Sequence, residues 1–364
     1  MRVLMAMSGG IDSTVSAMLL KEQGFELVGV TFRTFDSIKE HCLAKEKGCC
    51  SVESIMEAKH LAEKMGFEHH IVDYREVFKG TVISNFVQEY MNGRTPNPCV
   101  LCNSHIKWGV LMQQADAMGC EKIATGHYAR IRQHNGRHYL ATAADTHKDQ
   151  TYFLWMLTDE NLRRTLFPLG DYTKEHVRQM ARERGFETLS HKRESQEICF
   201  IPDNDYRRFL TDQIPDFPQR CPEGNYINAE GVVLGRHKGY ACYTIGQRKG
   251  LGIALGQPRY VTRIDPLRNE VTLGDYDDLY TSELEADHCR FREPEWLADQ
   301  PEVEARIRYK SPAQPATLQM EGSHAHLHFS QPVWGITPGQ SLVLYKDGLV
   351  VGGGIIGASE SNTF

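Results

Sequence analysis

Short apolar runs alternate with amphipathic segments over the first third of the chain. The apolar runs have the length of buried strands, and the segments between them space their apolar residues as helices do. The runs lie at residues 3–7, 26–32, 68–72 and 122–124, and the helical patterns at residues 52–65, 77–91 and 106–118. This alternation predicts an α/β fold in which a parallel sheet carries helices on both faces.

A different pattern follows a helix-rich stretch at residues 174–210. Pro215, Pro218 and Pro222 interrupt regular structure, and short β-rich runs separated by glycine turns begin near Gly231. The last runs lie at residues 303–309, 316–320, 324–329, 341–345 and 350–355. They predict a small antiparallel barrel. We therefore expect domains at residues 1–205, 206–280 and 281–364.

The first apolar run ends in Ser8-Gly9-Gly10, and Asp12-Ser13 opens the next helical segment. Adjacent glycines let backbone N–H groups converge, and a helix start adds unpaired N–H groups and a positive dipole end, so this turn suits phosphate oxygens. It lacks the Gly-Lys-Ser/Thr of a Walker A loop and the G-x-G-x-x-G spacing of a dinucleotide site. It resembles the S-G-G-x-D-S loop of pyrophosphatase-type ATP enzymes, which transfer AMP and release pyrophosphate.

The charge and composition of the chain narrow its possible partners. A net charge of −6 gives no overall basic field for nucleic acid, so RNA binding would need a local patch. One candidate is a basic stretch within residues 236–268 that only Asp265 opposes, although a solvated face has the same pattern. Its members are Arg236, Lys238, Arg248, Lys249, Arg259, Arg263 and Arg268.

The sequence also predicts where the protein works. It opens directly on a strand and has no apolar run near the ~18 residues that a membrane span needs, so we expect no leader and no membrane partner. Its ten cysteines are scattered rather than framed for disulfides, which suits a reducing compartment. We expect a cytoplasmic protein.

Cys99 and Cys102 lie in the stretch RTPNPCVLCN at residues 94–103. The two prolines disfavour a helix before Asn103, so we expect Asn103 to cap the next helix and Cys102 to lie at its start, where the dipole favours thiolate. A buried structural thiol and half of a zinc site are the alternatives. The apolar neighbours of Cys199 would by themselves indicate an inert core cysteine. Weak metal candidates are His41, Cys42, Cys49 and Cys50.

Several long motifs together resemble those of the tRNA-specific 2-thiouridylase family, nearly from end to end. They are MSGGIDS (7–13), GRTPNP (93–98), CN (102–103), ATGHY (124–128), KDQ (148–150), ICFI (198–201), TIGQRKGLG (244–252) and TPGQ (337–340). The resemblance implies an adenine-nucleotide α-hydrolase-like N-terminal domain with the pyrophosphatase loop. It further implies a small central β-rich domain that contacts tRNA, and a C-terminal antiparallel β-barrel.

The resemblance also implies a reaction. ATP adenylates O2 of the wobble uridine in a tRNA anticodon, and a persulfide on Cys199 then attacks C2 as AMP leaves. A cysteine desulfurase or sulfur-relay protein supplies the persulfide, and Cys102 resolves it, freeing sulfide or closing a Cys102–Cys199 disulfide. Mg²⁺ neutralises the phosphates, with Asp12 as its contact. The implied nucleotide-binding residues are Ala6, Met7, Ser8, Gly9, Gly10, Ile11, Asp12, Ser13, Phe32 and Gly126.

Further residues are implied as tRNA contacts, and the basic stretch adds two more. They are Asn97, Pro98, Cys99, Lys148, Asp149, Gln150, Arg248, Lys249, Arg308 and Tyr309. Many family members have Asp, a candidate general base, where this chain has Cys99. The base therefore lies elsewhere, or Cys99 acts as a thiolate, or no base is needed at that position. In an alternative that we rank below the persulfide, Cys99, Cys102 and Cys199 hold a [4Fe–4S] cluster.

Two other functions stay open. An adenylating synthase of the same loop class, such as an amidotransferase or an argininosuccinate-type synthase, would act on a metabolite without tRNA. It would not explain two separated reactive cysteines. A non-catalytic RNA-binding protein would bind without turning over ATP, and the intact SGGIDS loop argues against it.

Overall fold

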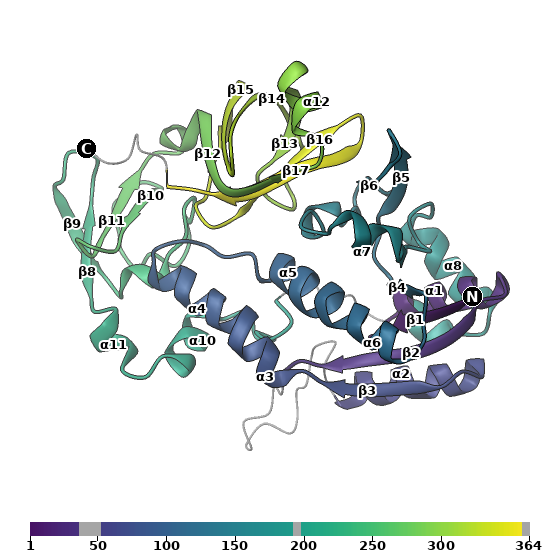
Figure 1. The fold of residues 1–364 in the computed structure, drawn as a ribbon. Coiled ribbons are helices and arrows are strands. Elements are labelled where there is room, and N and C mark those ends of the chain that lie inside the picture. The colour runs from purple at the N-terminus through teal and green to yellow at the C-terminus, as the bar shows by residue number, and fades with distance from the viewer. Residues whose placement is uncertain (36–51, 192–197, 359–364) are drawn as a thin grey trace. The chain divides into compact units, whose positions relative to one another are not determined.

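The computed structural model describes residues 1–35, 52–191 and 198–358, which divide into two compact units (Figure 1). Unit 1 contains Met1–Ile83, Pro98–Asn204 and Gly348–Val350. Unit 2 contains Ser84–Asn97, Asp205–Asp347 and the chain from Val351. No helix in the described residues is long and apolar enough to cross a membrane.

A five-stranded parallel sheet forms the centre of unit 1, with the strand order β3-β2-β1-β4-β7. The strands are β1 (Arg2–Ala6), β2 (Glu26–Arg33), β3 (His69–Asp73), β4 (Lys122–Ala124) and β7 (Thr165–Leu166). The chain places β2 and β3 on one side of β1 and β4 on the other. Ligands of open α/β sheets bind at the carboxyl ends of the strands beside such a reversal, which here lies between β1 and β4.

Helices cover both faces of this sheet. Val3 and Met5 of β1 share one core cluster with residues of α1, α2 and α8, whereas α6 contacts β1 and β4 on the other face, toward which Leu4 alternates. The helical segments are α1 (Ile11–Glu22), α2 (Val52–Met65), α3 (Arg75–Phe78), η1 (Lys79–Ile83), α5 (Pro98–Leu101), η2 (Cys102–Val110), α6 (Leu111–Ala117), η3 (Thr151–Phe153), α7 (Asp159–Arg163), α8 (Lys174–Glu183) and α9 (Glu187–His191). An antiparallel hairpin of β5 (Arg130–His134) and β6 (Arg137–Ala141) completes unit 1, and β6 buries its last three residues.

Unit 2 contains a four-stranded sheet with the order β10-β11-β8-β9, in which only β8 and β11 are parallel. Its strands are β8 (Gly224–Ile227), β9 (Val233–His237), β10 (Tyr260–Asp265) and β11 (Glu270–Gly274). The helical segments of unit 2 are α4 (Ser84–Met91), α10 (Tyr206–Gln213), α11 (Phe217–Arg220), η4 (Tyr240–Cys242), η5 (Asp277–Leu279) and α12 (Pro294–Asp299).

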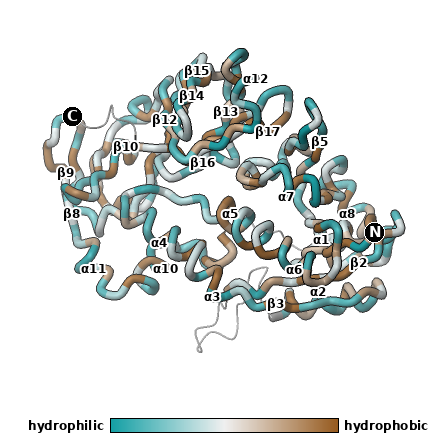
Figure 2. Tube along the Cα trace, viewed as in Figure 1, coloured by the Kyte–Doolittle hydropathy of each residue, from teal (hydrophilic) through white to brown (hydrophobic). Residues whose placement is uncertain are grey.

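The rest of unit 2 is an antiparallel barrel. Its strands follow the order β12-β15-β14-β13-β16-β17, and pairing of β12 with β17 closes it. They are β12 (Tyr280–Phe291), β13 (Glu302–Arg306), β14 (Gln314–Glu321), β15 (His324–Trp334), β16 (Ser341–Lys346) and β17 (Leu349–Ile356). Figure 2 shows hydrophobic residues along β17, nearly all buried, whereas the β5 strand of unit 1 is hydrophilic.

The expected fold class, a parallel-sheet domain followed by β-rich structure and a barrel, is confirmed, but the helix near the cysteines was predicted wrongly. It begins at Pro98 rather than at Asn103. The first N–H groups of a helix have no helical partner, so a proline at its first position loses no hydrogen bond. Asn103 is not a cap, because its side chain donates to the Phe153 carbonyl at 3.1 Å. Cys102 consequently lies inside the helical run and not at its start.

Candidate active site

The Ser-Gly-Gly loop (residues 8–13) joins β1 to α1 at the carboxyl end of the sheet. Gly9 has φ +65°, and a Cβ there would lie 2.3 Å from the Ser54 carbonyl oxygen. The Ser13 hydroxyl accepts from the Ser8 N–H at 3.2 Å and donates to the Gly10 carbonyl at 3.1 Å. Gly10 is the N-cap of α1, and no described side chain caps that helix. The first turn therefore keeps N–H groups for an anionic ligand.

Gly126 closes the other side of this loop. A Cβ at Gly126 would lie 2.8 Å from the Ser13 nitrogen and 2.9 Å from the Asp12 carbonyl carbon, so only glycine fits there. The motifs at residues 7–13 and 124–128 thus meet between β1 and β4. Ala6 ends β1, and Phe32 lies on the neighbouring β2.

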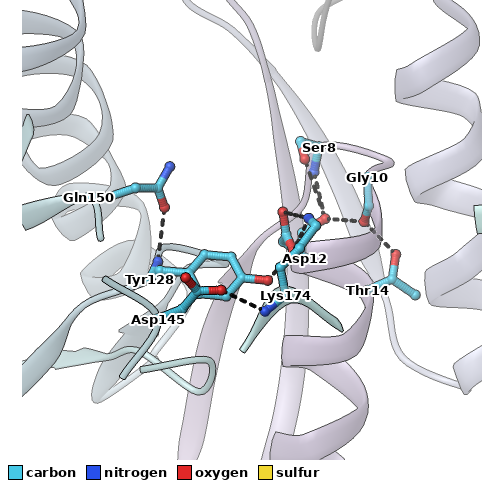
Figure 3. A network of polar contacts seen from close by, with 9 residues as sticks. Ser8, Gly10, Asp12, Thr14, Tyr128, Asp145, Gln150 and Lys174 are labelled. Carbon is cyan, nitrogen blue, oxygen red and sulfur yellow. Dashed lines mark hydrogen bonds and ion pairs between the residues drawn. The ribbon is translucent and has the colours of Figure 1, made fainter. Parts of the chain in front are cut away.

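Asp12 stands in the first turn of α1, and two side chains hold its carboxylate (Figure 3). The Lys174 ammonium donates to the two carboxylate oxygens at 2.7 and 2.8 Å, and the Tyr128 hydroxyl donates at 2.8 Å. Sequence reasoning identified Asp12 but missed Lys174, which belongs to none of the motifs. The available signal was a lysine at the first position of a helix, directly after the cap residue Thr173. The helix dipole disfavours a cation there, so such a lysine needs an acidic partner.

The KDQ turn (residues 148–150) holds the backbone of Tyr128, which contacts Asp12. The Gln150 side-chain oxygen accepts from the Tyr128 N–H at 2.9 Å, and the Gln150 N–H donates back to the Tyr128 carbonyl at 2.9 Å. Asp149 is only 3% exposed and accepts from the Ala143 N–H and the Thr151 hydroxyl. Asp145 accepts from the backbone N–H of Lys148 at 3.2 Å and of Lys174 at 2.9 Å. This turn directs most of its polar groups into unit 1.

His127 is a half-buried, neutral imidazole beside the same loop. Its Nδ1 lies 2.7 Å from the Thr125 hydroxyl, and its Nε2 lies 3.3 Å from the Lys107 ammonium. Burial, together with the Lys107 charge, holds the pKa of His127 well below its usual value. An ammonium can only donate, so Nε2 accepts and Nδ1 carries the proton.

The three candidate cysteines have different surroundings. Cys99 is exposed on α5, yet nearby protein atoms and Cys102 raise the pKa of its thiol to about 11. Water at the exposed thiol offsets part of that desolvation. Cys102 is half-buried and lies within the helical run, where α5 continues into η2. Cys199 is half-buried as well, while the adjacent Phe200 is buried, with its ring 5.6 Å from that of Phe78.

The described cysteines form no disulfide, and no three His, Cys, Asp or Glu side chains among the described residues are grouped to hold a metal ion. Cys99, Cys102 and Cys199 therefore do not fit a [4Fe–4S] cluster in this arrangement. The weak metal candidates His41, Cys42, Cys49 and Cys50 lie outside the described residues.

Within unit 2, two motifs far apart in sequence lie together. The Gln340 side-chain amide donates to the carbonyls of Thr95 and Pro96 at 2.9 and 3.0 Å. The Thr95 N–H donates to the Pro338 carbonyl at 2.8 Å. The TPGQ turn therefore fixes the backbone that leads to Asn97, which is half-buried, and to Pro98, which is buried.

The basic stretch of unit 2 divides into paired and exposed side chains. Arg259 pairs with Asp275 at 2.9 Å, and Arg236 donates to the Asn225 side chain at 3.0 Å. Arg248 and Lys249 are exposed and have no ion-pair partner among the described residues. Asp275, which lies outside the stretch, therefore opposes its charges in addition to Asp265, the one acid within it.

Arg308 and Tyr309 of unit 2 are half-buried. The Arg308 guanidinium donates to the Gly335 carbonyl and to the Thr337 hydroxyl, and it lies over the Trp334 ring at 5.2 Å. These contacts brace the barrel turn. The charged group of Arg308 is therefore less available to a phosphate than that of Arg248 or Lys249.

Comparison with known proteins assigns the chain to a family. Family models described as tRNA methyl transferase HUP domain, tRNA methyl transferase PRC-barrel domain and aminomethyltransferase beta-barrel domain match residues 1–203, 207–275 and 286–356. The tRNA-specific 2-thiouridylase MnmA of Amoebophilus asiaticus is 48% identical over 359 residues, covering 98% of this chain and 96% of the relative. The chain belongs to the tRNA-specific 2-thiouridylase family.

Other members are similarly close. The tRNA-specific 2-thiouridylase MnmA of Cytophaga hutchinsonii is 46% identical and covers 98% of each chain. That of Salinibacter ruber is 48% identical and covers 98% of this chain and 94% of its own. A solved 4-thiouridine synthetase in complex with RNA and bound ATP has 18% identity, a TM-score of 0.38 and coverage of 60% of this chain and 52% of its own, a likeness too distant to bear on this chain.

Proposed function

We propose that this protein is a tRNA 2-thiouridylase, an ATP-dependent sulfurtransferase that converts the wobble uridine of tRNA to 2-thiouridine. The observation that carries the proposal is the Ser-Gly-Gly loop at the β1–β4 reversal, with Asp12 held in place, in a chain 48% identical to a relative of that name. Methyl transfer, which the first family description names, would use neither this loop nor the two cysteines.

The loop fits the triphosphate of ATP. Gly9 and Gly126 let neighbouring backbone pack closely around the loop, and the uncapped start of α1 supplies N–H donors. The uridine O2 attacks the α-phosphate, pyrophosphate leaves, and AMP on O2 becomes a good leaving group. Mg²⁺ bound with the phosphates would neutralise their charge, and it commonly needs few protein ligands. The Lys174 ammonium and the Tyr128 hydroxyl already donate to the Asp12 carboxylate. Direct ligation of Mg²⁺ by Asp12 would therefore require those contacts to rearrange.

The cysteines carry the sulfur. A persulfide on Cys199, received from a cysteine desulfurase or a sulfur-relay protein, attacks C2 of the adenylated uridine, and AMP departs. Cys102 then attacks the Cys199 sulfur, so 2-thiouridine is released and a Cys102–Cys199 disulfide forms. A thiol reductant must return two electrons before the next turnover. An iron–sulfur cluster has no part in this proposal, because the three cysteines, all among the described residues, are not grouped to hold one.

The anticodon arm of tRNA is the proposed macromolecular substrate. The exposed Arg248 and Lys249 are the best candidates for phosphate contacts, and Asn97, Pro98 and Cys99 are proposed to meet the target base. We propose that Asp149 shapes its turn, since its carboxylate is buried and bonded. We also propose three domains, at residues 1–205, 206–280 and 281–364. We further propose that the protein works in the cytoplasm, where the tRNA pool is.

The decisive experiment is mass spectrometry of tRNA nucleosides after incubation with ATP, Mg²⁺ and a persulfide-generating desulfurase. We expect 2-thiouridine only when ATP and the desulfurase are both present. Pyrophosphate release that does not need tRNA would favour a metabolite synthase. Binding of tRNA without any ATP turnover would favour a non-catalytic RNA-binding protein.

A further inference from the structure

We propose that Lys174 is a positioning residue of the nucleotide site, whose charge neutralises Asp12 so that the Ser-Gly-Gly loop accepts a polyphosphate. The inference rests on the proposed function and names a residue to which no motif assigns a role. It is carried by the contacts of Lys174, by its burial and by its place on α8 (Figure 3).

The location of Lys174 is unfavourable for a lysine. Its side chain is only 9% exposed, and it is the first residue of α8, where the helix dipole repels a cation. A buried charge is costly unless it is paired, and long charged side chains are seldom fully buried. Asp12 supplies the compensation, since both of its carboxylate oxygens accept from the ammonium.

The Asp12 carboxylate, in turn, would repel a phosphate bound at the loop. Its carboxylate lies in the first turn of α1, beside the N–H groups that would face the phosphates. A negative charge a few ångströms from a triphosphate is repulsive, even for a carboxylate that is 32% accessible to water. The ammonium removes that repulsion, while the Tyr128 hydroxyl, at 2.8 Å, holds the carboxylate without adding charge.

The simpler explanation is that the ion pair only ties α1 to α8. The protein contains a matched tie at the other ends of the same helices, where Arg184 contacts Glu22 at 2.7 and 2.8 Å. That pair is more exposed, with side chains 29% and 52% accessible, and it stands away from the loop. Arginine there also lies at the favourable end of its helix dipole. It serves as the control for a purely structural role.

Titration calorimetry with ATP and with inorganic pyrophosphate tests the proposal on the full chain. We expect Lys174→Met to weaken both ligands by at least about tenfold, a loss near 1.4 kcal/mol. The double variant Asp12→Asn/Lys174→Met should regain most of that loss, because the uncompensated carboxylate is gone. Arg184→Met should bind both ligands within about twofold of the parent. Thermal unfolding of each variant shows which ones remain folded.

Three outcomes decide the matter. Parent-like ATP binding by Lys174→Met overturns the role of Lys174. So does a folded double variant that binds no better than Lys174→Met, since charge neutralisation requires the recovery. A parent chain that binds neither ATP nor pyrophosphate overturns the proposed function together with this inference, and that measurement distinguishes it from a failure of Lys174 alone.

Discussion

At the scale of single residues, the two central cysteines have separable roles. Activation of the uridine precedes attack by sulfur, so we predict that Cys199→Ser releases pyrophosphate in the presence of tRNA but makes no 2-thiouridine. Cys102→Ser should also lose thiolation, with tRNA trapped on Cys199 through the Cys199–S–S–C2 linkage that Cys102 normally cleaves. A pyrophosphate assay and nucleoside mass spectrometry measure the two steps.

The buried Cys120 is the matched control, because it lies away from the motifs and plays no part in the proposed chemistry. Cys120→Ser should retain both steps. Normal 2-thiouridine from Cys199→Ser or from Cys102→Ser would remove that cysteine from the mechanism.

His69 makes stability depend on pH. Burial, with the charges of His70 and Lys59, lowers its pKa to about 4, whereas an unfolded histidine titrates near 6.5. The unfolded chain therefore binds more protons between these values, so the free energy of unfolding falls as pH drops from about 6.5 to about 4. At 1.4 kcal/mol per pH unit, the loss attributable to His69 is about 2 kcal/mol at pH 5.

Denaturant unfolding at pH 7.5 and at pH 5 measures this loss. His69→Gln can still donate to the Thr31 hydroxyl, 2.8 Å from His69 Nε2, but it does not titrate. We expect the variant to lose about 2 kcal/mol less than the parent over that interval. Equal losses in both proteins would show that other groups cause the decline.

At the scale of elements, the loop between β1 and α1 depends on a neighbour from β4. A Cβ at Gly126 would meet the Ser13 nitrogen at 2.8 Å, so Gly126→Ala must displace the loop. We predict at least about tenfold weaker ATP binding, measured by calorimetry. Gly80→Ala, where the added Cβ has open space, should bind ATP as the parent does. Equal affinities for the two variants would mean that Gly126 does not shape the nucleotide site.

Elements with strong periodicity could be predicted from sequence. The helix expected over residues 52–65 is α2, and the strand expected over residues 122–124 is β4. The β5–β6 hairpin was missed because its first strand, β5, carries too little apolar pattern. The helix start at Pro98 was missed because proline was treated only as a breaker. Lys174 could not be found by motif, since its role depends on a contact with a residue 162 positions away.

At the scale of the whole molecule, a net charge of −6 means that tRNA must be held by local groups. Arg248→Ala and Lys249→Ala should each weaken tRNA binding and reduce the slope of log affinity against log salt by about 0.7 to 0.9. Arg308→Ala should mainly lower thermal stability, because that side chain braces the turn around Gly335. Titrations at several salt concentrations separate these effects. Parent-like slopes for both Arg248→Ala and Lys249→Ala would mean that the exposed charges are only a solvated face.

The spread of the Asp12 network along the chain has a consequence for biosynthesis. The loop is translated first, Tyr128 follows much later, and Lys174 emerges after both. Until Lys174 leaves the ribosome, the nascent chain holds an Asp12 carboxylate without its counter-charge, at the place where phosphates would approach. If Lys174 neutralises Asp12 as proposed, we expect nucleotide to give the first strands little help in folding before then, and a fragment that ends before Lys174 to bind nucleotide poorly.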